Sequence, residues 1–296
     1  MSKTNILLIA MALVSLSVSA QFYVSASGGY AIPSAGVRFG TETTVNGVEN
    51  TYGSYGEGIH TQLRAGYFFN KTFGIEGAFG YLHGADQTSI LVDVPNQPFV
   101  DVKSRGRAYG ASLSLVYKFT NNIYGRFGAL IKVGGRTEAV GKVNANLPAQ
   151  LVNPAAPIGA TVPLNMEFTR DYNGRLPLGF IGAIGYKYDL SKKIALFAEL
   201  EYMGISVTRD RSNIGEFTAT LAGQNVKRAD LLNLVQNTPA LLSQFESLLP
   251  LIKDETLYVD SLSTEELQNP GNRELSQKVP YSSFGINFGI TYTFGK

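Results

Sequence analysis

The chain has 296 residues, of which 44% are hydrophobic and only 16% are charged, and it contains 32 Gly, 16 Tyr, 17 Phe and neither Cys nor Trp. This composition is too apolar for a disordered chain, and the lack of cysteine excludes a disulfide framework, a cysteine-ligated zinc site and thiol catalysis. The formal net charge is +2, so the sequence predicts no binding to nucleic acid.

The first twenty residues are typical of a secretory signal peptide. Lys3 supplies a positive start, residues 6–14 form an unbroken apolar run, and residues 18–20 (Val-Ser-Ala) match the small-residue pattern before a cleavage site. A membrane-anchoring helix would need roughly 20 apolar residues, more than this run provides. We therefore expect residues 1–20 to be a signal peptide, with the mature chain beginning at Gln21.

The mature chain repeats one pattern, in which large apolar residues alternate with small or polar ones. The clearest run is 283–294, where every second residue is Phe, Ile or Tyr. A period of two predicts strands and argues against helices. The strands predicted in this way lie near residues 21–30, 59–69, 73–85, 107–119, 123–133, 178–190, 194–207 and 281–294.

The connections between these strands alternate strictly in length. Short polar turns at 70–72, 120–122 and 191–193 separate long connections near 31–58, 86–106, 134–177 and 208–280. Outer-membrane barrels show this alternation, with short periplasmic turns and long outer loops. We predict an all-β fold for residues 21–296: an eight-stranded antiparallel transmembrane up-and-down β-barrel with long extracellular loops. The alternative fold is a soluble β-sandwich, in which the second face of each strand would carry charge. Here that face carries mostly small residues, which suit the narrow lumen of a barrel.

Two turn segments and the last strand resemble a known family. The segments Tyr-Phe-Phe-Asn-Lys-Thr-Phe-Gly at 67–74 and Tyr-Lys-Phe-Thr-Asn-Asn-Ile-Tyr at 117–124 resemble small outer-membrane β-barrel proteins of the OmpA, OmpX and OmpW type, closest in style to those of the Bacteroidota. As architecture, the resemblance covers most of the mature chain. It implies a location in the bacterial outer membrane, with outer-membrane lipid and lipopolysaccharide around the barrel.

The resemblance also implies folding by the barrel-assembly machinery, which in that family reads alternating aromatic residues in a last strand that ends in Phe. The residues that resemble this assembly signal are Gly285, Phe288, Ile290, Tyr292 and Phe294. This sequence departs from the family pattern because Gly295 and Lys296 follow the Phe.

The predicted inward face of the barrel carries a set of charged side chains. They are Arg64, Glu76, Lys118, Arg126, Lys132, Lys187, Glu199 and Glu201. The register of the first hairpin places Arg64 diagonal to Glu76, and that of the last short hairpin places Lys187 diagonal to Glu199. Charges in a narrow barrel must be paired or hydrated. Two interpretations remain open: a structural network that plugs the barrel, and a polar path for small solutes.

The last long connection contains an apolar segment at 227–252. Thr238 followed by Pro239 is typical of a helix start, so we predict two short amphipathic helices at about 228–237 and 239–249. They either pack on each other or over the barrel mouth as a lid, or they present an apolar surface to an extracellular protein, a lipid or an apolar ligand. The residues assigned to that surface are Leu231, Leu234, Leu241, Phe245 and Leu248.

Nothing in the sequence indicates catalysis. The only histidines, His60 and His83, are expected on opposite faces of the wall, and neither begins the His-x-Ser pattern of outer-membrane acyl hydrolases. No spacing matches a metal-ligand set, and we predict no cofactor. The first functional hypothesis is a non-enzymatic surface or structural protein that acts through its extracellular loops. The alternative is a narrow porin-like channel or carrier for small or hydrophobic solutes.

Overall fold

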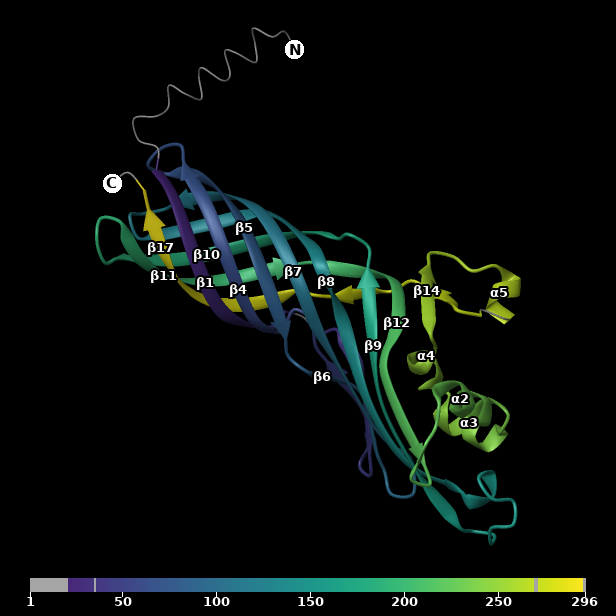
Figure 1. Ribbon diagram of the computed structural model, residues 1–296. Helices are drawn as coiled ribbons and strands as arrows, with labels where there is room; N and C mark the ends of the chain where they lie inside the picture. Colours follow the sequence, from purple (N-terminus) through teal and green to yellow (C-terminus); the bar gives the residue numbers. More distant parts are fainter. Residues whose placement is uncertain (1–20, 35, 269–270, 295–296) are drawn as a thin grey trace.

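The computed structural model describes residues 21–34, 36–268 and 271–294, so the predicted signal peptide lies outside the described residues. Eight strands form a closed antiparallel barrel (Figure 1), in which each strand pairs with the next and the first pairs with the last. The barrel strands are β1 (Gln21–Pro33), β4 (Gly58–Phe68), β5 (Phe73–Gly84), β7 (Phe99–Lys118), β8 (Ile123–Pro148), β10 (Leu178–Asp189), β11 (Ile194–Gly204) and β17 (Ser283–Thr293). The predicted fold class is confirmed.

Alternation along each strand sorts side chains between the lumen and the outer wall. On β7, Tyr117, Leu113 and Tyr109 point outward and are exposed. Ser114 and Val116 lie between them in sequence, point inward and are buried. The period of two in the sequence is therefore the geometric consequence of a wall that is apolar outside and small or polar inside.

Aromatic side chains gather at two levels of the outer wall. Beside the short turns, the ring centroids of Phe73 and Tyr117 lie 4.9 Å apart. Toward the other end, those of Tyr81 and Tyr109 lie 5.0 Å apart. An apolar band between two aromatic levels is the surface that a barrel presents to a lipid bilayer, and Leu113 lies midway between them on β7.

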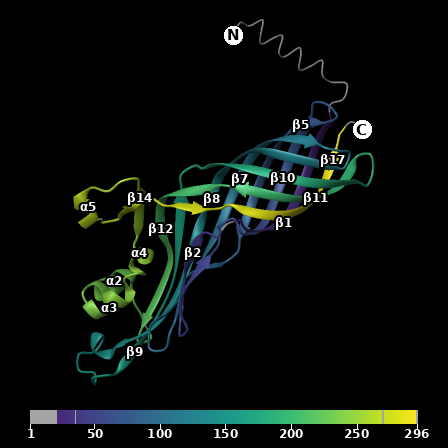
Figure 2. The ribbon, with the colours of Figure 1, turned by 180° about the vertical axis from the view of Figure 1, so that it is seen from behind.

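A second structure projects from the barrel end opposite the short turns (Figure 1, Figure 2). It is a sheet built from the far halves of β7 and β8 together with β2 (Arg38–Thr44), β3 (Gly47–Tyr52), β6 (Gln87–Asp93), β9 (Thr161–Gly174) and β12 (Ser206–Leu221). Because short turns face the periplasm in such barrels, we call it the extracellular sheet. Its short peripheral strands are β13 (Gln224–Asn225), β14 (Glu255–Val259), β15 (Arg273–Leu275) and β16 (Lys278–Pro280).

The extracellular sheet is more regular than the sequence predicted. Several prolines occur in 134–177, yet the irregular parts of this connection are only 149–160, which includes the 3₁₀ helix η1 (Ala149–Leu151), and 175–177. Pro148 ends β8 and Pro163 lies near the start of β9, where a strand tolerates a missing N–H.

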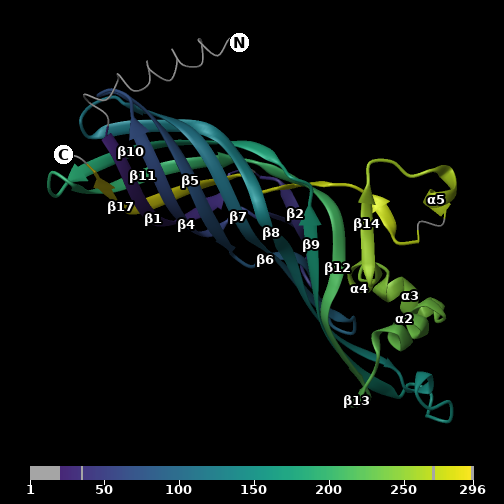
Figure 3. The ribbon, with the colours of Figure 1, turned by 45° about the horizontal axis from the view of Figure 1, so that its top comes forward.

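Short helices cover one face of this sheet. The predicted helices correspond to α2 (Arg228–Gln236) and α3 (Pro239–Phe245), followed by α4 (Leu249–Ile252). They lie beside β12 (Figure 3), and α5 (Thr264–Gln268) lies further along the chain. Among the described residues, no helix is long and apolar enough to cross a membrane.

Candidate functional site

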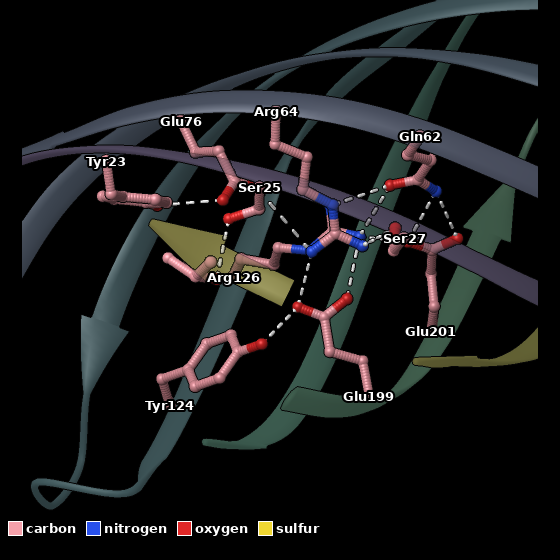
Figure 4. A network of polar contacts seen from close by, with 11 residues as sticks. Tyr23, Ser25, Ser27, Gln62, Arg64, Glu76, Tyr124, Arg126, Glu199 and Glu201 are labelled. Atoms are coloured by element: carbon pink, nitrogen blue, oxygen red, sulfur yellow. Dashed lines mark hydrogen bonds and ion pairs between the residues drawn. The ribbon is translucent and has the colours of Figure 1, made fainter. Parts of the chain in front are cut away.

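A buried network of charged side chains crosses the middle of the lumen (Figure 4). Its charged members come from four barrel strands and all occupy inward positions: Arg64 on β4, Glu76 on β5, Arg126 on β8, and Glu199 and Glu201 on β11. Each is almost fully buried. We call these five residues, with Gln62, Tyr23 and Tyr124, the lumen network.

Glu199 is the central acceptor of the lumen network. Its Oε1 lies 2.7 Å from Nη1 of Arg64, and its Oε2 lies 3.3 Å from Nη2 of Arg126. The hydroxyl of Tyr124 donates to the same Oε1 at 2.7 Å. One carboxylate therefore holds two guanidinium groups that come from strands that are not neighbours in the barrel.

Glu201 and Gln62 continue the network toward the outer end. Arg126 forms an ion pair with Glu201. Gln62 Nε2 donates to both carboxylate oxygens of Glu201, at 3.0 and 3.1 Å, and Gln62 Oε1 accepts from Nε of Arg64 at 3.0 Å. Side chains alone nearly fill an eight-stranded barrel, and this continuous set of contacts runs across the lumen from β4 to β8 and β11.

Glu76 is the least firmly held charge. Its Oε2 accepts from the hydroxyl of Tyr23 at 2.9 Å, but the ion-pair contact that it makes among the described residues is a 3.9 Å approach of its Oε1 to Nε of Arg126. Glu76 Oε1 and Arg126 Nε have no hydrogen-bond partner within the described residues. Within the lumen network, three carboxylates face two guanidinium groups.

The structure places all of the predicted lumen charges on the inward face but brings only five of them together. Lys118 lies toward the short turns, with Nζ 3.6 Å from the ring centroid of Phe68. Lys187 forms an ion pair with Asp189 at 3.1 Å. Lys132 lies on the outer side of the network, with Nζ near the Gly135 carbonyl.

The two predicted pairings, Arg64 with Glu76 and Lys187 with Glu199, were wrong. The hairpin registers were right, since Gly66 faces Glu76 and Gly185 faces Glu199. Arg64 instead reaches across the lumen, because closing the barrel places the carboxylate of Glu199 within reach of its long side chain. Uncharged members of the network were missed, although the inward positions of Tyr23, Gln62 and Tyr124 in the alternation could have identified them.

The apolar residues of the last long loop form a core, so of the two alternatives left open the exposed surface is wrong. Leu231, Leu241, Phe245 and Leu248 are at most 4% exposed, and Leu234 is partly buried. They pack against side chains of the extracellular sheet, such as Val143, Met166 and Phe168, and do not cover the mouth as a lid. The partner face is formed by the outer parts of β7, β8 and β9 together with β12.

The remaining predicted residues lie as follows. Phe288, Ile290 and Tyr292 of the assembly signal face outward from β17, Gly285 faces inward, and Phe294 lies just beyond the strand. His60 is buried with Nε2 3.0 Å from the carbonyl oxygen of Gly56, and His83 is exposed on the opposite face. Among the described residues, no group of three or more acidic or histidine side chains could hold a metal ion.

An exposed ion-pair cluster lies on the outer face of the extracellular sheet. Glu138 accepts from Nε of Arg105 and from Nε of Arg136, both at 2.8 Å. Burial would raise the pKa of Glu138, but these two hydrogen bonds and charges outweigh burial and hold the pKa below its ordinary value. Arg136 also forms an ion pair with Asp171 at 3.2 Å.

Comparison with known proteins gives one family match. The model of the family described as outer membrane protein beta-barrel domain matches residues 6–224. No curated protein matches the chain. Similar solved structures include a major outer membrane protein from Thermus thermophilus, with 12% identity and a TM-score of 0.37 over 93% of this chain and 99% of that chain. Neisserial surface protein A has 13% identity and a TM-score of 0.33, over 93% of this chain and 99% of that chain. Ail, the attachment invasion locus protein of Yersinia pestis, has 10% identity and a TM-score of 0.28, over 93% of this chain and 97% of that chain.

Proposed function

Since the chain belongs to the outer membrane protein beta-barrel domain family, we propose that it is a plugged, non-enzymatic barrel that acts at the bacterial cell surface through its extracellular sheet. The observation that carries this proposal is the lumen network. Its arginines and glutamates are almost fully buried and bonded to one another across the barrel. Buried charges held in this way resist hydration, because breaking one pair leaves its partner uncompensated in a low-dielectric interior.

The extracellular sheet supports the surface role. One face is covered by helices α2–α4 and is apolar, whereas the other face carries exposed charges in cross-strand pairs. Lys142 and Glu167, for example, approach to 3.8 Å and are both more than half exposed. A wide polar face that projects beyond the bilayer suits contact with an extracellular protein, because charged groups there remain hydrated until a partner binds.

A narrow channel is the second candidate. Cavities of about 80 and 50 Å³ lie on the outer and inner sides of the lumen network. A rearrangement of the Arg64 and Arg126 side chains would connect them. In that case the three glutamates would line the path and favour cations.

Single-channel conductance in a planar bilayer tests the proposal, with refolded chain 21–296 whose folding is checked by circular dichroism. We expect no unitary steps from the wild type. We expect steps when Arg64, Arg126, Glu199 and Glu201 are all replaced by Ser, since this removes the plug. Replacing Lys142 and Glu167 by Ser is the matched control and should stay silent. Steady steps from folded wild type would refute the plug and favour the channel.

A further inference from the structure

The outer half of the lumen differs from the middle because it is apolar. A cavity of about 80 Å³, which we call the outer chamber, lies on the outer side of the lumen network. Its apolar lining includes Leu82, Ala108, Leu130, Ile181, Ile205 and Val207, most of them almost fully buried. A cavity with this apolar lining favours an apolar occupant over water.

Small inward residues create the space. Gly80 on β5 and Ala108, Gly110 and Ser112 on β7 line the outer chamber side by side. A Cβ added at Gly110 would meet atoms no closer than 3.6 Å, which is ordinary van der Waals contact. The wall is therefore open toward the chamber at this position, and a larger side chain there would occupy it.

Ordered side chains close both ends of the outer chamber. The inner end is bounded by Gln62, which is fixed by the lumen network. The outer end is bounded by Tyr281, whose hydroxyl lies 2.6 Å from Oγ1 of Thr137 and whose ring centroid lies 5.5 Å from that of Tyr55. The chamber is thus a dead end within the lumen, which suits binding better than conduction.

Lys132 places a positive charge at this apolar cavity. It lines the chamber from β8, is partly buried, and has Nζ 3.1 Å from the carbonyl oxygen of Gly135 and 5.9 Å from the ring centroid of Tyr281. Within the described residues, it forms no ion pair with a carboxylate. A partly desolvated ammonium group beside an apolar space is complementary to an anionic group on an apolar chain.

The barrel wall is interrupted beside Lys132. On one side, β8 pairs with β10 up to Ile131 and with β9 from Thr137 onward, and both stretches keep the same register. Residues 132–136 lie between these stretches and have no ladder partner on that side among the described strands. Leu176, which lies across this interruption, and Leu178, which pairs with Ile131 at its edge, are 74% and 77% exposed. Among the described strands, residues 132–136 of the chamber wall are therefore held in the ladder by β7 alone.

We propose that the outer chamber binds a small amphiphile, with its short apolar chain among the buried aliphatic residues and its carboxylate paired with Lys132. The chamber is smaller than the roughly 150 Å³ cavity that holds benzene, and a water occupies roughly 30 Å³, so the ligand class is a short-chain carboxylic acid. This inference concerns a site that the surface role does not use, and it holds whether or not the lumen network opens.

Binding is measured by ¹⁹F NMR with trifluoroacetate, a short-chain acid that suits a chamber of this size, and its neutral match 2,2,2-trifluoroethanol, added to refolded chain 21–296. We expect Lys132→Met to weaken binding of the acid by roughly tenfold to hundredfold, the value of a hydrogen bond to a charged group, and to leave the alcohol unchanged. Lys132→Arg should retain the acid. Lys142→Met, on the outer face of the extracellular sheet, is the matched control and should have no effect.

A second pair of variants locates the ligand. Gly110→Val fills the chamber and should abolish binding of both compounds. Gly77→Val is the same change on the outward face of β5, where an added Cβ meets nothing within 4 Å, and should leave binding intact. No binding by wild type, or binding that survives Gly110→Val, would overturn the site. Loss in Gly110→Val with no effect of Lys132→Met would overturn the carboxylate assignment.

Discussion

Glu199 and Glu76 belong to the same buried network but have very different partners, so neutralising each should have a different effect. Glu199 accepts from Arg64 at 2.7 Å and pairs with Arg126 at 3.3 Å. Glu76 approaches a cation only at 3.9 Å, and its bond from Tyr23 can be kept by an amide oxygen. Glu76 is also one of three carboxylates that face two guanidinium groups in the lumen network.

The two expected magnitudes follow from these contacts. Glu199→Gln leaves two buried guanidinium groups without their shared carboxylate, and breaking a buried ion pair in this way costs about 3–5 kcal/mol. Glu76→Gln balances the network at two charges of each sign and retains a hydrogen-bond acceptor. We therefore expect the free energy of unfolding to change by no more than about 1 kcal/mol, in either direction.

The assay is urea unfolding of the refolded barrel in lipid vesicles, followed by far-ultraviolet circular dichroism because the chain has no Trp to report by fluorescence. With a slope of about 2 kcal/mol per molar urea, Glu199→Gln should lower the midpoint by roughly 2 M. Glu76→Gln should shift it by less than about 0.5 M.

Equal destabilisation by the two substitutions would refute the reasoning, because it would mean that Glu76 is as well compensated as Glu199. Little effect from either would mean that water hydrates the network. That second result would also weaken the proposal of a plugged lumen.

Three further predictions concern regions outside the lumen network. Leu231→Ala removes a side chain on the buried face of α2 that is 2% exposed, and it should destabilise the protein by about 2–5 kcal/mol. Leu242→Ala, at a side chain that is 37% exposed, should cost much less. Hydrogen exchange of residues 228–252 compares the two variants, and equal protection would contradict the packing described. Leu113→Arg on the lipid-facing wall should lower the free energy of unfolding in vesicles by about 2–4 kcal/mol. Leu275→Arg, at a similarly exposed residue on the extracellular side, should lower it little, and the two unfolding curves would coincide if the outer wall did not face lipid. Because the pKa of Glu138 is lowered in the folded protein, its stabilising effect is complete above the unfolded carboxyl pKa of about 4.3 and is lost as the pH falls through the lower folded pKa. Amide exchange in the extracellular parts of β7 and β8 should therefore accelerate below about pH 4 in the wild type but not in Glu138→Gln.

The sequence by itself determined the barrel strands and the direction of their side chains. A period of two is a local property, because successive side chains of a strand point to opposite faces whatever the strand pairs with. Tyr117 and Leu113 could therefore be assigned to the outer wall, and Arg126 and Glu199 to the lumen. Turn length fixed the hairpin registers for the same reason.

Only the tertiary structure decided which inward charges meet and what the long connections build. Arg64 and Glu199 belong to strands far apart in the chain, and no hairpin register brings them together; barrel closure and two long side chains do. The extracellular sheet depends on pairings such as β9 with β12 and on helices that cover its apolar face. Leu231 and Phe168 become a core only because each supplies the surface that removes the other from water, and burial of that kind cannot be assigned from either segment alone.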